Sequence, residues 1–162
     1  MAVLPKRFAR VGLTMHPTKT ALIAFRKPKA HQGSESGHGP CTFLGLTHYW
    51  TTSRQGFWVM KRRTASKRVR RTKTSLWRWC RNHRHAPLQY QYQMRGAKRR
   101  GHYQYYGIRG NFRLREEVRR AAERAWRYWL SRRSSKSAIG WKKFGKFMQT
   151  YILPIPRIVH NI

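Results

Sequence analysis

The chain has 162 residues and carries 37 Lys and Arg against four acids, which gives a formal net charge of +33. Its seven Trp, eight Tyr and seven Phe exclude a disordered basic tail, because so aromatic a chain has a large apolar surface to bury. A folded body this positive repels itself, and nucleic acid, whose phosphates release condensed counterions on contact, is the expected partner.

The first part of the chain predicts one helix end and one strand. Residues 4–11 have the pattern of a helix end that Gly12 closes as a C-terminal cap. Residues 20–25 are a short apolar run and are predicted to be a buried strand. Residues 27–40 contain Gly and Ser without periodicity, so we expect a loop there.

A β-hairpin is predicted next. Residues 41–50 are rich in β-branched and aromatic side chains, residues 53–56 have the composition of a turn, and residues 57–60 form the returning strand. The composition becomes strongly basic at Lys61. We therefore place the boundary between a sheet-containing part and a helical part at this residue.

Three helices and a shorter fourth are predicted after Lys61. Helical periodicity runs from residue 64 to 80, from Pro87 to about residue 107 or 110, and over residues 114–129. The predicted apolar faces are, in that order, Ala65, Val69, Leu76 and Cys80; Tyr90, Met94, Ala97, Gly101 and Tyr105; and Leu114, Val118, Ala122, Ala125 and Trp129. A short helix at residues 141–148 and an extended tail at residues 153–162 follow. The predicted fold class is α+β.

The acids are too few and too scattered for most hydrolytic and polymerase chemistry. The sequence contains no Asp, and three of its four Glu lie on the third predicted helix. Glu116 and Glu117 are adjacent and would point roughly 100° apart on a helix, so they cannot share one metal ion. Two-metal phosphoryl transfer and glycoside hydrolysis are therefore excluded for this chain.

The same acids have a structural interpretation. At helical i±4 spacing Glu123 can pair with Arg119 and with Arg127, and Glu116 can pair with Arg120. We therefore expect these carboxylates to support the helix rather than to carry out catalysis.

Metal and cofactor sites are not expected in this chain. The histidine pairs that come into consideration are His31 with His38 and His83 with His85. No carboxylate or CxxC motif accompanies them, so contacts to nucleic acid are the preferred interpretation. Cys41 and Cys80 are far apart in sequence and predict neither a disulfide framework nor a zinc site. A Cys–His nucleophile pair remains an alternative that no spacing favours.

Basic residues interleaved with tyrosines are the candidate binding residues. A single basic run is usually a solvated helix face, but here the acids that would balance such faces are missing. We expect Tyr105 to pack in the core, whereas Tyr103 and Tyr106 lie on other faces. The predicted RNA-binding residues are Lys61, Arg62, Arg63, Lys67, Arg68, Arg70, Arg71, Arg99, Arg100, Tyr103, Tyr106 and Arg109.

No membrane or export segment is expected. The longest apolar run, residues 21–25, is far too short to cross a bilayer, and the basic amino terminus lacks the apolar stretch of a secretory signal. The charges are spread over several segments rather than along one amphipathic helix. A cytoplasmic location is the expectation.

Several motifs, in order, resemble one protein family. Residues 100–112, with the sequence RGHYQYYGIRGNF, resemble the maturase-specific region (domain X, or thumb) of bacterial group II intron reverse transcriptases. Residues 12–20 resemble the sixth reverse-transcriptase block of these enzymes, and residues 43–48 resemble the seventh, which holds the primer. Residues 156–160 are similar to the end of the family's sequence. The resemblance covers almost the whole chain.

The resemblance implies a carboxy-terminal third of such an enzyme. Residues 1–60 would be the end of the palm, and residues 61–162 would be the thumb, a three-helix bundle. Lys19 would lie near the incoming nucleotide, and Phe43, Leu44 and Gly45 would lie near the primer end. The metal-binding aspartates of the family have no counterpart, so Mg²⁺ would belong to the complete enzyme and not to this chain.

The function that the resemblance implies is binding of group II intron RNA to support splicing. In the complete enzyme the same surface would also hold the template–primer duplex for RNA-directed DNA synthesis. One alternative is that the chain completes a polymerase in trans, together with the missing amino-terminal reverse-transcriptase portion. Another is a decayed fragment that binds nucleic acid without preference.

Overall fold

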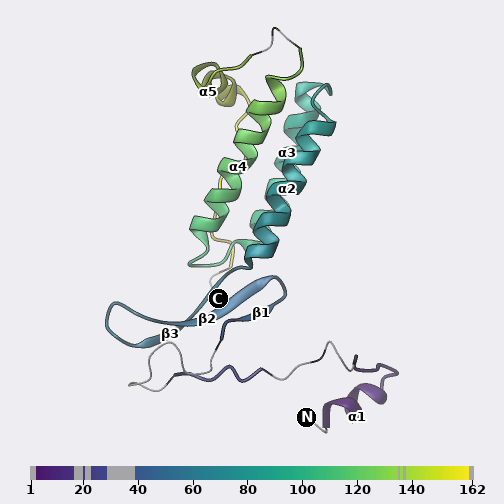
Figure 1. The fold of residues 1–162 in the computed structure, drawn as a ribbon, viewed down its shortest axis with the longest axis vertical. Helices are drawn as coiled ribbons and strands as arrows, with labels where there is room; N and C mark the ends of the chain where they lie inside the picture. The colour runs from purple at the N-terminus through teal and green to yellow at the C-terminus, as the bar shows by residue number, and fades with distance from the viewer. Residues whose placement is uncertain are drawn as a thin grey trace.

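A small antiparallel sheet followed by a group of helices forms the described part of the chain, as seen in a computed structural model (Figure 1). The structure describes residues 3–16, 20, 23–28, 39–134, 136 and 138–160. The elements are α1 (Val3–Ala9), β1 (Cys41–Phe43), β2 (Leu46–Thr52), β3 (Trp58–Thr64), α2 (Ser66–Asn82), α3 (Leu88–Tyr106), α4 (Phe112–Leu130) and α5 (Trp141–Thr150). The predicted α+β class is confirmed.

In the segment before the sheet the predicted helix is confirmed and the predicted strand is not. Residues 27, 28, 39 and 40 of the predicted loop lie in no helix or strand, and residues 29–38, which include His31 and His38, lie outside the described part. The helix α1 ends at Ala9, and Gly12 adopts a positive φ of 71°, so its predicted role as a C-terminal cap is confirmed. The predicted strand at residues 20–25 is wrong for its described residues, which form no ladder. Phe25 instead stacks on Trp50 with ring centroids 5.7 Å apart. A short apolar run does not reveal whether its backbone has a pairing partner. Residues 21 and 22 lie outside the described part.

The sheet has one more turn than the sequence predicted. Its strands are antiparallel in the order β1-β2-β3, and residues 41–50 reverse direction at Leu44 and Gly45. These residues have φ values of 47° and 78°, as a two-residue hairpin turn requires. A leucine rarely adopts a positive φ, so a Leu-Gly pair does not predict a hairpin turn, whereas an Asn-Gly pair does.

The second hairpin confirms the predicted turn but extends further than expected. Ser53 donates its N–H to the Phe57 carbonyl at 2.8 Å, and Gly56 has a φ of 81°. The strand β3 then continues to Thr64, which pairs with Leu46. The predicted boundary at Lys61 therefore falls within a strand, and the change from sheet to helix comes at residue 65.

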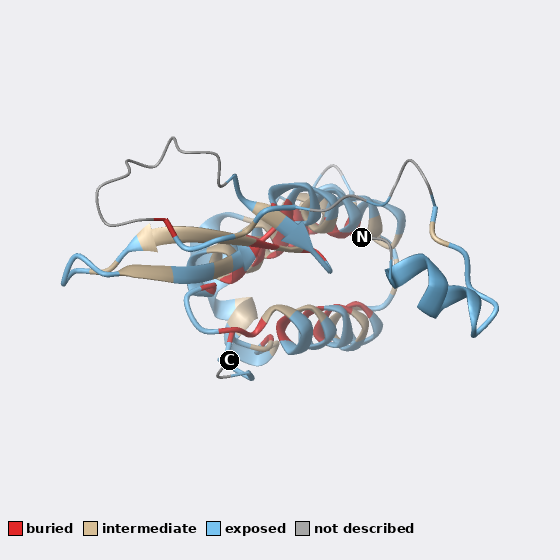
Figure 2. Ribbon diagram, turned by 90° about the horizontal axis from the view of Figure 1, so that it is seen from below, coloured by how far each residue is buried: buried red, intermediate tan, exposed pale blue. Residues whose placement is uncertain are grey.

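The predicted faces of α2 and α4 are confirmed. Val69, Leu76 and Cys80 of α2 are buried, and so are Val118, Ala122 and Ala125 of α4. Figure 2 shows buried positions in red along the helices. The apolar spacing of three and four residues places these side chains on one face of each helix. The two faces pack together, and Trp126, which is completely buried, extends the α4 face toward α5.

The predicted face of α3 is wrong. Its buried residues are Gln91, Arg95, Gly96, Arg99 and Tyr103. Tyr90 and Tyr105, predicted to be core, are 41% and 51% exposed. Arginine stems are apolar, and their guanidinium groups find carbonyl, hydroxyl and aromatic partners inside the bundle. A periodicity that counts Arg as polar therefore assigns this helix the wrong rotation.

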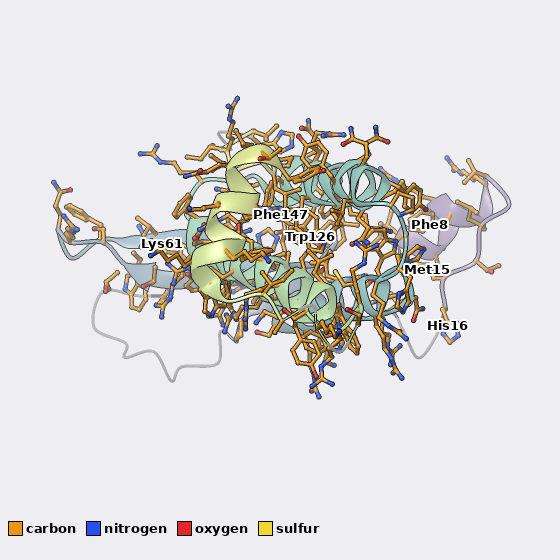
Figure 3. The ribbon with its side chains drawn as sticks, turned by 90° about the horizontal axis from the view of Figure 1, so that it is seen from above. Phe8, Met15, His16, Lys61, Trp126 and Phe147 are labelled. Carbon is orange, nitrogen blue, oxygen red and sulfur yellow. The ribbon has the colours of Figure 1, made fainter. Side chains whose placement is uncertain are left out.

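A second core surrounds Trp126 at the α5 end of the bundle. Figure 3 shows Trp126 and Phe147 in the middle of the helices, and their rings lie edge to face with centroids 5.0 Å apart. The Trp126 indole N–H donates to the Gln91 amide oxygen at 2.9 Å. The Arg95 guanidinium lies 4.0 Å from the Trp126 ring centroid. The predicted helix at residues 141–148 is confirmed, and it extends to Thr150.

Asn111 joins the sheet to the helices. Its side-chain amide donates to Thr64 Oγ1 at 2.7 Å and to the Tyr106 carbonyl at 2.9 Å, and its Oδ1 accepts the Thr64 N–H at 3.1 Å. The Ala65 N–H donates to the Gly45 carbonyl at 2.9 Å. These bonds hold the end of β3 and the first turn of the sheet against the ends of α3 and α4.

The segment after α5 returns along the helices as an extended chain, as predicted. Its residue Val159 donates its N–H to the Gly107 carbonyl at 2.6 Å, and His160 forms a parallel bridge with Ile108. The Arg115 guanidinium donates to the Arg157 carbonyl. Residues 161 and 162 lie outside the described part.

Candidate nucleic-acid interface

The outer face of α2 carries a row of exposed cations. Lys67, Arg70, Arg71 and Arg78 recur at helical spacing, and all four are exposed. Together with Thr74 and Ser75 they line a shallow hollow of about 520 Å³ that contains no acid. We call these six residues the outer α2 face.

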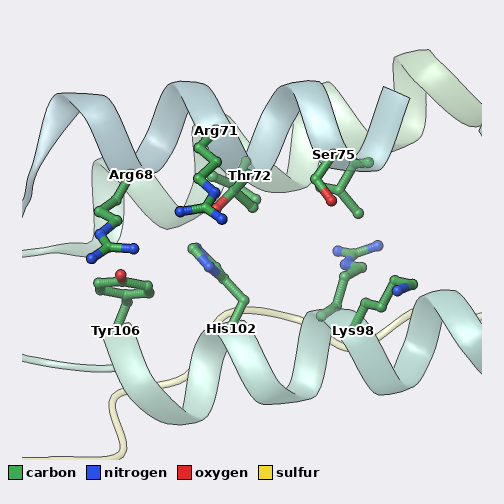
Figure 4. A pocket seen from close by; sticks show the side chains of 10 residues that line it. Arg68, Arg71, Thr72, Ser75, Lys98, His102 and Tyr106 are labelled. Atoms are coloured by element: carbon green, nitrogen blue, oxygen red, sulfur yellow. The ribbon is translucent and has the colours of Figure 1, made fainter. Parts of the chain in front are cut away.

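A groove between α2 and α3 continues from this face. Its volume is about 350 Å³. It is lined by Arg68, Arg71, Thr72, Ser75, Leu76, Lys98, Arg99, His102, Tyr106 and Val118. Arg71 and Ser75 line both hollows, so the groove and the outer α2 face form one surface. Figure 4 shows Arg68 and Arg71 reaching from α2 toward Tyr106 and His102 on α3.

The floor of this α2–α3 groove is apolar and its aromatic groups are uncharged. Leu76 and Val118 are buried at 6% and 2% exposure. Burial, and to a lesser extent the charge of Arg115, lowers the pKa of His102 to about 4. The imidazole is therefore neutral at pH 7 and offers one hydrogen-bond donor and one acceptor. Burial also raises the pKa of Tyr106, so its hydroxyl stays protonated.

The carboxylates of α4 are occupied with other partners. Glu123 accepts from Arg119 at 2.7 Å and Glu116 accepts from Arg120 at 3.2 Å, as predicted. Arg119 also donates to Glu116 at 2.5 Å, and these bonds lower the pKa of Glu116. The predicted Glu123–Arg127 pair does not form, because Arg127 donates to the Ile139 carbonyl at 3.0 Å.

The remaining acid of α4 balances a single lysine of α2. Glu117 accepts from Lys73, which lies beside the outer α2 face. Its carboxylate lines neither that face nor the α2–α3 groove. No described carboxylate lines either hollow, and among their cations only Arg99 lies within 4.0 Å of a described carboxylate.

A second group of cations lies on the sheet. Lys61, Arg62 and Arg109 line a hollow of about 580 Å³ together with Tyr49 and Met60. Arg63, also on β3, lies over the Tyr49 ring at 5.2 Å. These four predicted binding residues thus come together at β3 and the loop after α3, not on a helix.

Two predicted binding residues are in the interior. Arg99 and Tyr103 are 2% and 4% exposed, and the Arg99 Nε and Nη2 atoms donate to the Tyr103 hydroxyl at 3.2 Å each. Arg99 Nη1 lies 3.9 Å from Glu123 Oε1. Tyr103 therefore cannot stack on a base from solvent, contrary to expectation. Arg100, which follows Arg99 in the sequence, is exposed and lines a separate hollow with Arg157.

The residues predicted to lie near a primer form the first turn of the sheet. Phe43 and Leu44 are exposed at 63% and 67%, whereas Gly45 is buried beside Tyr106 and Arg68. The Tyr105 hydroxyl donates to the Leu44 carbonyl at 2.6 Å. This turn therefore lies at the end of the α2–α3 groove. Lys19 lies outside the described residues.

Several groove residues were missed by the sequence reasoning. These are Thr72, Ser75, Lys98 and His102. Thr72 follows Arg68 and Ser75 follows Arg71 at i+4 spacing on one helix, which would have been a signal. Lys98 and His102 required the correct rotation of α3, which the sequence did not give.

Among the described residues, no three His, Cys, Asp or Glu side chains gather in a way that would hold a metal ion. No described helix combines the length and the apolar character needed to cross a bilayer. No protein-family model, curated protein or solved structure matches the chain.

Proposed function

We propose that this chain is an RNA-binding protein that holds structured RNA against the outer α2 face, the α2–α3 groove and the sheet hollow. One observation carries the proposal: the outer α2 face and the groove form one cationic surface that no described carboxylate lines. Phosphate oxygens are the natural counter-charges for such a surface, and their binding releases condensed ions.

Exposed aromatic side chains support RNA over other polyanions. Trp77, Tyr90 and Tyr105 are at least 40% exposed on the helices, Phe43 is exposed on β1, and Phe57 is exposed in the turn before β3. RNA presents unpaired bases in loops and bulges, and aromatic rings stack on them. A purely electrostatic binder of a smooth anionic surface has no need of such rings.

The RNA that we propose is that of a group II intron, and the activity is that of a maturase. This rests on the resemblance of residues 100–112 to the maturase-specific region. Within that segment His102, Tyr106 and Arg109 line the hollows described above, whereas Gly107 and Asn111 are buried and make contacts that hold the fold together. The motif thus combines groups available to RNA with groups that position them.

A second candidate function is completion of a polymerase in trans. The observation that favours it is the exposed apolar pair Phe43 and Leu44 at the first turn of the sheet. Such side chains suit contact with a further protein portion or a primer. Any Mg²⁺ in that assembly would be held by the other portion, because this chain contains no Asp.

The test is an RNA titration with charge-matched variants. The triple variant Lys67→Gln, Arg70→Gln, Arg71→Gln should bind RNA at least tenfold more weakly than wild type, and its salt slope should fall by about three. Its melting temperature should stay nearly unchanged, because exposed charges contribute little to folding. The control, Lys142→Gln, Lys143→Gln, Lys146→Gln, removes the same net charge from the exposed side of α5. Equal losses in both triple variants would reject the α2 surface as the binding site.

Salt and RNA identity complete the test. With about six phosphate contacts, affinity should fall on the order of a thousandfold between 50 and 200 mM salt. A group II intron RNA should bind more tightly than an unrelated structured RNA of the same length. A steep salt dependence without that preference would leave general nucleic-acid binding in place of the maturase function.

A further inference from the structure

The α2–α3 groove differs in chemistry from the outer α2 face. The outer face is lined only by cations and by two hydroxyl side chains, Thr74 and Ser75, whereas the groove has an apolar floor and two aromatic rings. Its volume of about 350 Å³ lies within the range of small-ligand pockets, roughly 300–1,000 Å³. The groove therefore suits a compact, partly apolar group with a negative charge.

The rings of the groove are held in place. Tyr106 lies between two neighbours, with ring centroids 4.8 Å from His102 and 4.7 Å from Tyr105. A methyl group at Gly45 would stand 2.9 Å from the Tyr106 hydroxyl, so the turn presses against this side chain. A ring fixed in this way loses little conformational entropy when a base stacks on it.

The cations at the rim of the groove are available to an anion. Arg68, Arg71 and Lys98 form no ion pair with any described carboxylate. Arg99 adds a buried charge below them, since its Nη1 atom has no hydrogen-bond partner and only a distant carboxylate at 3.9 Å. A phosphate group at the rim could accept charge-assisted hydrogen bonds from Arg68, Arg71 and Lys98.

The charged groups that face His102 are all positive. They are Arg68 and Arg71 of α2, Lys98 and Arg99 of α3, and Arg115 of α4. Burial, and to a lesser extent the charge of Arg115, lowers the pKa of the imidazole and keeps it neutral, so its ring can hydrogen-bond to a base edge or to a 2′-hydroxyl.

From this geometry we propose that the α2–α3 groove takes one unpaired nucleotide of the bound RNA. Its base packs against Tyr106 and His102, and its phosphate lies on Arg68, Arg71 and Lys98. The inference rests on the proposed RNA-binding function and adds that the groove selects unpaired over paired RNA. Bases in an A-form duplex are stacked and paired, so they cannot enter the groove, whereas the shallow, exposed outer α2 face can still contact the duplex backbone.

The experiment fills the groove without changing its charge. Thr72 is half-buried and lines the groove, so Thr72→Phe should occlude it. Binding of a ten-nucleotide single-stranded RNA should weaken about tenfold, as expected for the loss of one stacked base, whereas binding of a blunt-ended, fully paired RNA duplex should change less than twofold. The matched control is Thr74→Phe, the same substitution on the outer α2 face, which should leave the preference for the single strand intact.

A second measurement uses the wild-type chain and so does not depend on a variant that folds. Irradiation of its complex with single-stranded RNA containing 5-iodouridine should give cross-links at Tyr106 or His102. Unchanged single-strand binding by a folded Thr72→Phe variant, or cross-links confined to other residues, would overturn the groove assignment alone. Failure of the wild-type chain to bind either RNA would reject the proposed function together with the inference.

Discussion

Arginine serves both as surface charge and as core side chain in this protein. Arg95 and Arg115 are completely buried, and neither forms an ion pair with a described carboxylate. Arg95 donates to the Ala122 carbonyl at 2.7 Å and lies over Trp126, and burial lowers its pKa to about 10. Carbonyl oxygens and aromatic ring faces are thus the partners of these buried guanidinium groups, in place of carboxylates. The chain has only four acids.

His102 should make the stability of the fold depend on pH. Burial lowers its pKa from the usual 6.5 to about 4. Between these two pH values the unfolded chain binds a proton at this histidine, whereas the folded chain does not. The contribution of the neutral ring to stability is present above about pH 6.5 and is lost as the pH falls toward 4. The melting temperature should therefore drop between pH 7 and about pH 4.5, and His102→Asn should reduce that drop.

The matched control for this prediction is His48→Asn, which changes a half-buried histidine of β2. It should leave the slope of melting temperature against pH unchanged. A His102→Asn variant with the full wild-type slope would show that other groups cause the acid sensitivity.

At the scale of elements, the extended carboxy-terminal segment closes the bundle through Gly107. Val159 and His160 donate to its carbonyl at 2.6 and 3.0 Å. A methyl group at this position would meet the Tyr103 carbonyl and would stand 2.8 Å from Val159 Cγ2. The glycine is needed for this close approach of two chain segments, since its φ of −75° is open to any residue.

Gly107→Ala should therefore detach this segment from the end of α3. We expect a loss of about 1–3 kcal/mol in the free energy of unfolding, as for other overpacked positions. Denaturant unfolding measures this loss. Limited proteolysis should also cleave the segment that follows Leu153 faster in the variant than in the wild-type chain. The control, Gly101→Ala, has open space around it in the middle of α3, so it should stabilise the helix by about 0.5–1 kcal/mol. Equal effects of the two variants would contradict the packing role of Gly107.

At the scale of the whole molecule, the distribution of the described charges favours binding of a polyanion rather than catalysis. The described acids all lie on α4 and pair with neighbouring cations, whereas α2, α3 and β3 present cations to solvent. Such an arrangement attracts a polyanion. It provides no paired carboxylates to hold the metal ions of phosphoryl transfer.

The 162-residue chain by itself should extend no primer on an RNA template with Mg²⁺ or Mn²⁺. The physical reason is the absence of Asp from the sequence and the ion pairing of Glu116, Glu117 and Glu123. A primer-extension assay on purified protein tests this prediction. Template-dependent synthesis that disappears when one of these Glu residues is mutated would refute it.

The sequence by itself determined the charge, the α+β class and the helices whose apolar spacing is unambiguous. Val69 and Leu76 of α2 and Val118 and Ala122 of α4 are buried as their periodicity predicted. Large aliphatic side chains leave water whenever a helix packs, so their spacing reports the packed face directly. The i, i+4 ion pairs of α4 followed for the same local reason.

Only the tertiary structure decided the rotation of α3, the extra hairpin turn and the composition of the groove. Arg95, Arg99 and Tyr103 are buried because carbonyls, a hydroxyl and Trp126 from other elements meet their polar groups. Leu44 accepts a positive φ because the turn docks on Tyr105. Whether an amphipathic side chain is buried or exposed depends on the partners that distant segments of the chain provide. The local spacing of residues in the sequence does not indicate those partners.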